Sequence, residues 1–150
     1  MLAEEEGIEV VEHKFNNEQL KGLYVDNVIT LNSHMQTIAE KKCVLAEELG
    51  HYYTTHGDIL DQTNIKNIKQ ENLARAWSYK NLIPIYSFVE AYQAGTRNRH
   101  EMAEFLEVTE EYLNEALQYY KSKHGLYYFT NNYLVYFDPF AVVEKYWFIE

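Results

Sequence analysis

The sequence predicts an α+β fold in which short strands open and close the chain and helices fill the middle. β-Branched residues alternate near the start, apolar residues follow a helical period from about residue 33 to residue 123, and strand-forming aromatic residues follow residue 126. The 150 residues contain no repeat and no linker rich in proline or glycine. We therefore expect a single domain over residues 1–150.

The opening strands are expected over residues 8–13, 23–25 and 28–31. The first segment is β-branched and roughly alternating. The other two flank Asp26 and Asn27, and both of these residue types tolerate the positive φ that a two-residue turn requires. The sequence therefore predicts a strand followed by a hairpin.

The helical middle is expected to begin with a long amphipathic helix from about Ser33 to about Gly57, which is a suitable residue for a helix end. After a polar loop over residues 58–66, a second helix is expected from residue 67 to residue 81, before Pro84. Four residues share the expected apolar face of the first helix: Ile38, Leu45, Leu49 and Tyr52.

Shorter helices are expected over residues 85–123, with breaks around Gly95 and at residues 108–109. The chain is then expected to return to strand in a closing hairpin of residues 126–129 and 133–137. Aromatic residues are dense from there to the C-terminus, and a small domain cannot bury all of them. Either the C-terminal tail folds over one face, or an exposed aromatic surface serves dimerisation or partner binding.

Composition excludes several classes of function. The 13 Lys and Arg against 23 Asp and Glu give a net charge of −10, which argues against binding driven by nucleic-acid phosphates. No apolar run approaches the ~20 residues of a membrane span, and the acidic N-terminus does not resemble a signal peptide. The single cysteine, Cys43, is expected to be a small buried residue, and it fits a reducing cytoplasm.

The candidate catalytic residues lie in the first long helix. At about 100° per residue, Glu47, Glu48 and His51 share one polar band beside the apolar face. Because Glu47 and His51 are four residues apart, both side chains can hold one metal ion, while Glu48 can face a bound water. This is the arrangement of the H-E-x-x-H motif with glutamate in place of the first histidine.

A catalytic zinc usually needs a third protein ligand, and the second helix supplies a candidate. Glu71 lies near the start of that helix, twenty residues after His51. Its carboxylate can reach the first helix if the two helices pack face to face. Ala74 gives the small contact surface that such close packing requires.

These two segments resemble the ImmA/IrrE family of metallopeptidases, which is common in phages and integrative mobile elements. The first helix of that family reads H-E-L-G-H, and residues 48–51 match the end of this motif. The second helix reads approximately E-x-x-A-x-x-F-A-x-x-L-L-x-P. Five residues match it at the same spacing: Glu71, Ala74, Trp77 (for Phe), Leu82 and Pro84. The resemblance covers roughly residues 8–125 and implies a zincin-like fold.

The resemblance also implies site residues. Carried over by position, His51 and Glu71 are zinc ligands, Glu48 is the general base, and Glu47 takes the place of the first ligand histidine. A carboxylate binds zinc at ~2.0–2.2 Å, so a Glu47/His51/Glu71 site is chemically possible. The extra negative charge should make the bound water less acidic, and it makes manganese relatively more competitive.

Other interpretations of these residues remain open. His56 follows His51 by five residues and can serve as a ligand if the helix ends early and the chain bends back. Alternatively, Glu47, Glu48 and His51 form a solvated helix face, and Glu71 is a favourable acid in the first turn of its helix.

Residues 101–109 are similar to the start of a helix-turn-helix, but the next helix opens with Glu110 and Glu111. Such acidity would repel phosphates, so we expect a helix pair that serves packing. The same acidity would suit a basic protein partner.

The resemblance leads to two hypotheses of function. The first is a zinc-dependent (or manganese-dependent) endopeptidase that cleaves and inactivates a helix-turn-helix repressor of a phage or mobile element. The alternative is a catalytically degenerate protease fold that captures a repressor or another regulatory protein without cleavage. Neither hypothesis requires direct contact with nucleic acid or a membrane.

Overall fold

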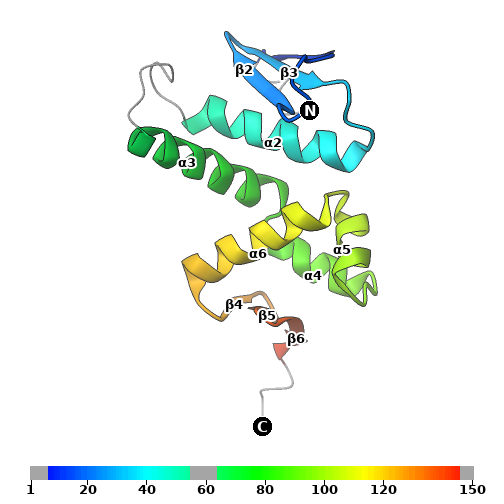
Figure 1. Ribbon diagram of the computed structural model, residues 1–150. Helices are drawn as coiled ribbons and strands as arrows, with labels where there is room; N and C mark the ends of the chain where they lie inside the picture. The colour runs from blue at the N-terminus through cyan, green and yellow to red at the C-terminus, as the bar shows by residue number, and fades with distance from the viewer. Residues whose placement is uncertain (1–6, 55–63, 146–150) are drawn as a thin grey trace. The chain divides into compact units, whose positions relative to one another are not determined.

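The computed structural model describes residues 7–54 and 64–145 and confirms the α+β class (Figure 1). Contacts within the chain define two compact units, residues 1–82 and residues 83–150. The single domain expected from chain length stays a prediction, and the two units are described in turn. No helix in the described ranges is both long enough and apolar enough to cross a membrane.

The first unit packs a small mixed sheet on one side of a helix and a second helix on the other (Figure 1). Its sheet has the order β1-β3-β2, with β1 parallel and β2 antiparallel to β3. The elements are β1 (Glu9–His13), β2 (Gly22–Val25), β3 (Val28–Asn32), α2 (Ile38–Thr54) and α3 (Asn64–Leu82).

The predicted hairpin is confirmed, and its turn explains why. Asp26 and Asn27 join β2 to β3 with φ values of 49° and 63°. Both values lie in the left-handed region that a two-residue hairpin turn of type I′ requires. Because side chains alternate along β3, Ile29 and Leu31 both enter the core.

The motif helix α2 begins later than the sequence predicted. Before it, the Ser33 amide donates to His13 O and so continues the pairing of β3 with β1, and the Met35 amide donates to Asn32 O in a turn. The Thr37 hydroxyl then accepts a hydrogen bond from the Glu40 amide at 3.1 Å, which caps the helix. The expected start near Ser33 was therefore wrong by about a turn.

The expected apolar face of α2 is correct for three of its four residues. Leu49 is buried in the core, and Leu45 and Tyr52 pack against the same cluster as Ile29. Ile38, in contrast, is 76% exposed. It lies in the first turn of the helix, before α2 meets the sheet, so that part of the prediction was wrong.

The second helix is longer than expected. α3 begins at Asn64, so residues 64–66 are helical and the expected loop over residues 58–66 was wrong at its end. Residues 55–63, which include the expected helix end at Gly57 and the candidate ligand His56, lie outside the described residues.

The second unit packs two of its three helices, α4 and α6, against an antiparallel sheet of order β4-β5-β6, and α5 packs on both of these helices. Its helices confirm the breaks expected around Gly95 and at residues 108–109. The elements are α4 (Tyr86–Gln93), α5 (Arg99–Leu106), α6 (Glu110–His124), β4 (Tyr127–Thr130), β5 (Tyr133–Phe137) and β6 (Phe140–Glu144).

Two side-chain caps fix the helix starts in this unit. Asn98 accepts a hydrogen bond from the Glu101 amide at 2.8 Å, and Thr109 accepts one from the Tyr112 amide at 3.1 Å. The closing hairpin is also present, but a turn at residues 138–139 adds β6, which the sequence did not predict.

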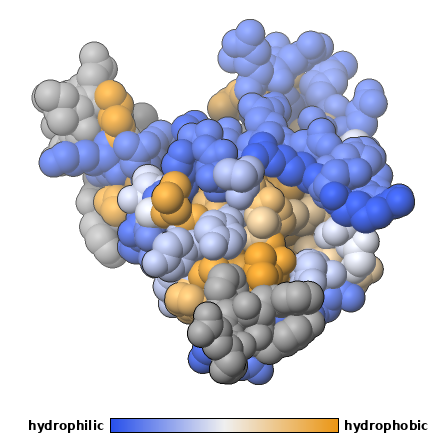
Figure 2. All heavy atoms as spheres, turned by 90° about the horizontal axis from the view of Figure 1, so that it is seen from below, coloured by the Kyte–Doolittle hydropathy of each residue, from blue (hydrophilic) through white to orange (hydrophobic). Residues whose placement is uncertain are grey.

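The aromatic residues of the closing strands differ in exposure between the edge strand and the central strand. Phe137 is buried, whereas Tyr127, Tyr128 and Phe129 on the edge strand β4 are 50%, 38% and 54% exposed. Figure 2, which views the molecule from below, shows hydrophobic side chains gathered among hydrophilic ones on that side of the molecule. Tyr146, Trp147 and Phe148 lie outside the described residues, so neither expectation for the aromatic tail is decided.

Candidate active site

Strand β2 lies directly against the polar band of α2 because its first residue is a glycine. A Cβ on Gly22 would lie 2.6 Å from Val44 Cγ1 and 3.2 Å from Glu48 Oε1. Only a residue without a side chain fits this close approach. The Glu48 side chain is therefore covered by the backbone of β2.

A second glycine brings the two helices of the first unit together. A Cβ on Gly50 would overlap the carbonyl oxygen of Ala74 in α3, and Ala74 is fully buried. The small contact surface expected at Ala74 is confirmed. Because α2 and α3 approach so closely, side chains beside this contact can meet across it.

His51 and Glu71 are the side chains that meet. His51 Nε2 lies 3.2 Å from Glu71 Oε1, within hydrogen-bonding and ion-pair distance. The His51 side chain is 19% exposed and the Glu71 side chain is 47% exposed. The structure thus brings together two residues that the sequence separates by twenty positions.

The contact shifts the pKa of both partners toward the charged forms. The hydrogen bond that His51 donates to Glu71 raises the pKa of His51, and the negative charges of Glu71, Glu48 and Glu47 act in the same direction. The same hydrogen bond lowers the pKa of Glu71. Partial burial opposes both shifts without reversing them.

The pKa of Glu48 is shifted toward its neutral form instead. Burial against β2 raises the pKa of Glu48 from 4.5 to about 7, and the nearby charges of Glu47 and Glu71 add to the rise. The His51 charge lowers it in part. A carboxyl group with a pKa near neutrality can accept a proton and release it again at physiological pH.

The donor set meets part of what a catalytic metal needs. Two ligands bound to one tetrahedral zinc are about 3.4 Å apart, so the separation of His51 Nε2 and Glu71 Oε1 suits a shared ion. Within residues 7–54 and 64–145, however, no three His, Cys, Asp or Glu side chains are grouped to hold a metal. His51 Nδ1 is also buried with no hydrogen-bond partner in this part of the chain. Metal-binding histidines usually donate a hydrogen bond from that second nitrogen.

Two other residues considered in the sequence, Glu47 and Cys43, differ in their surroundings. Glu47 is half-buried, and its charge raises the pKa of both Glu48 and His51, so it lies electrostatically close to the pair. Cys43 is buried, as expected of a small apolar side chain. The sequence did not single out Gly22, although a glycine inside a strand commonly marks a close backbone approach.

Comparison with known families supplies the last observation. The family model for Peptidase M78, described as the IrrE N-terminal-like domain, matches residues 3–118. The chain belongs to this family. The match includes α2 and α3 with Glu48, His51 and Glu71, and the chain therefore carries a metallopeptidase-like domain. No curated protein and no solved structure is significantly similar to it.

Proposed function

We propose that the chain is a metal-dependent endopeptidase that cleaves and inactivates a helix-turn-helix repressor of a phage or mobile element. The observation that carries the proposal is the His51–Glu71 contact beside a half-buried Glu48, all within a domain of the M78 family. His51 and Glu71 are the metal ligands, and Glu47 is the third. The preferred ion is zinc, with manganese as the second candidate.

The chain's own residues have distinct tasks in this reaction. When bound, the ion would polarise the scissile carbonyl and acidify the attacking water. Glu48 takes the proton from that water at its carboxylate, since burial by β2 holds its pKa near neutrality. Gly22 makes this burial possible, and the Gly50–Ala74 contact holds His51 against Glu71.

A specific observation favours the alternative of capture without cleavage. Glu47 stands where the family motif has histidine, and the described residues contain no complete group of three ligands. In this second proposal the fold binds the repressor and leaves its chain intact. The acidic charge of the domain suits a basic partner in either case.

Metal content is the first test. Protein purified without chelator and dialysed against metal-free buffer is expected to retain close to one equivalent of zinc or manganese by mass spectrometry. Loss of this metal in His51→Ala would support the site. Failure of the wild-type protein to take up either metal from micromolar solution would contradict the endopeptidase proposal.

A cleavage assay separates the two proposals. The chain is incubated with candidate helix-turn-helix repressors, and the products are resolved by mass spectrometry. Repressor fragments that disappear with Glu48→Gln would support cleavage and exclude simple capture. A stoichiometric complex with intact repressor would support capture.

A further inference from the structure

A small polar cavity in the second unit lies outside everything assigned so far. It has a volume of about 200 Å³ and is formed by the start of α5, one face of α6 and the end of β5 with the turn after it. A water molecule takes about 30 Å³ of the liquid, so the cavity has room for a small ion with part of its hydration shell. All of its lining residues belong to residues 83–150, so it is built by one unit.

The cavity combines a buried apolar base with polar walls. Leu117 and Phe137 line it and are both buried in the core, so its base is firmly supported. Three polar residues line it from α6: Asn114, Gln118 and Lys121. Together with Leu117 they follow the helical spacing i, i+3, i+4 and i+7, so the four side chains share one face of α6. The polar groups of this face therefore point toward the same space.

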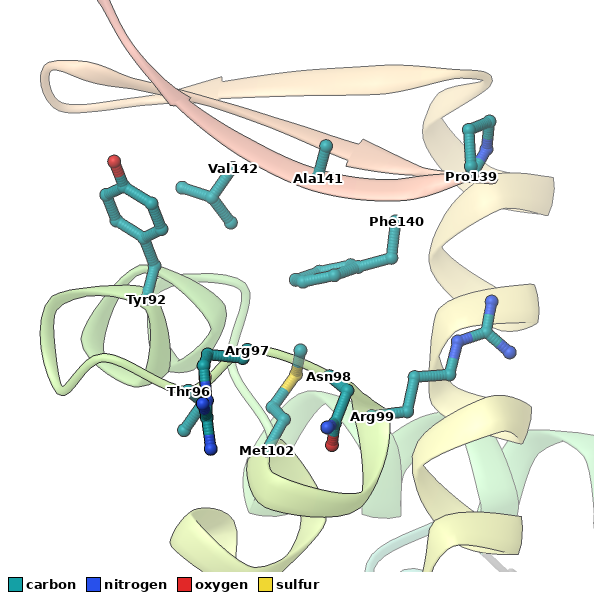
Figure 3. Close-up of a pocket in the computed structure, with 10 residues that line it drawn as sticks. All are labelled: Tyr92, Thr96, Arg97, Asn98, Arg99, Met102, Pro139, Phe140, Ala141 and Val142. Atoms are coloured by element: carbon teal, nitrogen blue, oxygen red, sulfur yellow. The ribbon is translucent and has the colours of Figure 1, made fainter.

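Arg99 brings a positive charge to this cavity from α5. Figure 3, a close-up of the neighbouring space beside Phe140, shows the Arg99 side chain turned away from Phe140 and toward α6. Its Nη1 donates a hydrogen bond to Asn114 Oδ1 at 2.8 Å, and Asn114 carries no charge. A guanidinium has five N–H donors, and this contact uses one of them. The charge of Arg99 is therefore held at the cavity by a neutral partner, with donors left for a ligand.

Lys121 brings the second positive charge, and Asp138 offsets one of the two. Lys121 Nζ lies 2.9 Å from Asp138 Oδ2, in an exposed ion pair. The hydrogen bond and the charge of Lys121 lower the pKa of Asp138, and the charge of Arg99 acts in the same direction. Both cations therefore act on a single carboxylate. The cavity lining keeps one uncompensated positive charge in a chain of net charge −10.

The Gln118 amide lies between the two cations. It follows Asn114, the partner of Arg99, by one helical turn and precedes Lys121 by three residues on the same face of α6. Among the described residues its side chain has no hydrogen-bond partner. Guanidinium, ammonium and amide groups all supply N–H donors, and donors that carry positive charge bind anionic oxygens most strongly. The lining therefore selects an anion with oxygen acceptors.

We propose that this cavity binds a small oxyanion, whose oxygens accept hydrogen bonds from Arg99, Gln118 and Lys121. A carboxylate and a phosphate present this chemistry alike, and the experiment below distinguishes them. Asp138 competes with the ligand for the same two cations, so it sets the affinity of the site. The cavity belongs wholly to the second unit, whereas the candidate active site belongs to the first. The proposal therefore stands whether or not the chain is a peptidase.

The test is an NMR titration of the full chain, labelled with nitrogen-15, with sodium phosphate and separately with sodium acetate. Each anion is added up to about 50 mM, and sodium chloride keeps the ionic strength constant. The side-chain amide signals of Asn114 and Gln118 should shift and reach saturation, and the anion that produces this identifies the source. Arg99→Gln is expected to weaken binding about fivefold or more. Arg97→Gln is the matched control, because Glu101 holds the Arg97 guanidinium outside this cavity, and it should leave the affinity unchanged.

Asp138→Asn tests the same site with a change of opposite sign. It removes the competing carboxylate and leaves both cations in place, so binding should become about threefold tighter or more. The side chains changed in these variants are exposed, and backbone signals away from each substitution report that the variant is folded. Shifts that do not saturate with either anion would overturn the proposal. An affinity that Arg99→Gln leaves unchanged, or that Asp138→Asn does not raise, would also overturn it.

Discussion

Among single residues, Glu48 is expected to contribute most to the pH dependence of the free energy of unfolding. Its carboxyl group binds a proton more tightly in the folded chain, where the pKa is about 7, than in the unfolded chain, where it is near 4.5. Between these values the folded state holds more protons, so the free energy of unfolding falls as pH rises. His51 acts in the same direction, because its raised pKa gives stability that is lost as pH rises through the folded value.

We therefore predict that metal-free protein loses about 1–3 kcal/mol of unfolding free energy from about pH 5 to about pH 8. Urea denaturation in the presence of chelator, followed by circular dichroism, measures this loss. Glu48→Gln should reduce the loss and leave the smaller part due to His51. A variant with the same pH dependence as the wild-type protein would show that Glu48 is not buried as a carboxyl group.

Glu71 provides a second prediction for a single residue. Glu71→Gln keeps the shape of the side chain but removes its charge, so we expect metal affinity to fall at least about tenfold. Competition with a chromogenic chelator gives the affinity. Glu111→Gln, an exposed change in the second unit, is the control and should have no effect. Unchanged affinity in Glu71→Gln would mean that Glu71 is not a ligand.

At the scale of elements, the contact between α2 and α3 depends on Gly50. Gly50→Ala places a methyl group against the backbone of Ala74, which cannot move away as a side chain would. We predict a loss of about 2–4 kcal/mol in unfolding free energy and weaker metal binding, because His51 moves away from Glu71. Urea denaturation measures the first effect, and chelator competition measures the second.

Gly95→Ala is the matched control for this prediction. Nothing lies within 4 Å of a Cβ at Gly95, whose φ is +86°, so the cost there is backbone strain of about 1–2 kcal/mol. A Gly50→Ala protein as stable as Gly95→Ala would contradict close packing of α2 on α3.

The elements also show what sequence patterns can and cannot predict. Local signals located the β2–β3 turn at Asp26-Asn27 and the helix break at residues 108–109, because each depends on the conformation of a few adjacent residues. The helical spacing of residues 47–51 and the resemblance to the ImmA/IrrE motifs were enough to place His51 beside Glu71. The burial of Glu48 was not predicted, since it depends on the path of β2 across α2. Strand β6 was not predicted, since its pairing with β5 depends on the turn at residues 138–139.

At the scale of the whole molecule, the distribution of charge favours binding to a protein over binding to DNA. The chain has a net charge of −10, and α6 opens with Glu110 and Glu111 in its first turn. Negative charge suits the first turn of a helix, but it would repel phosphates from a recognition helix. The α5–α6 pair instead buries Met102, Ala103 and Leu113, as expected of helices that pack together.

We therefore predict no measurable binding to duplex DNA, even at about 20 mM salt, where contacts with phosphates are strongest. Fluorescence anisotropy with a labelled duplex of mixed sequence measures this. A variant with Glu110→Lys and Glu111→Lys is the informative comparison, because it reverses the charge at the start of α6 and leaves the buried residues unchanged. Should the wild-type chain bind the duplex with an affinity that falls steeply as salt is added, α6 would be a recognition helix. The acidic charge would then no longer support a basic protein partner.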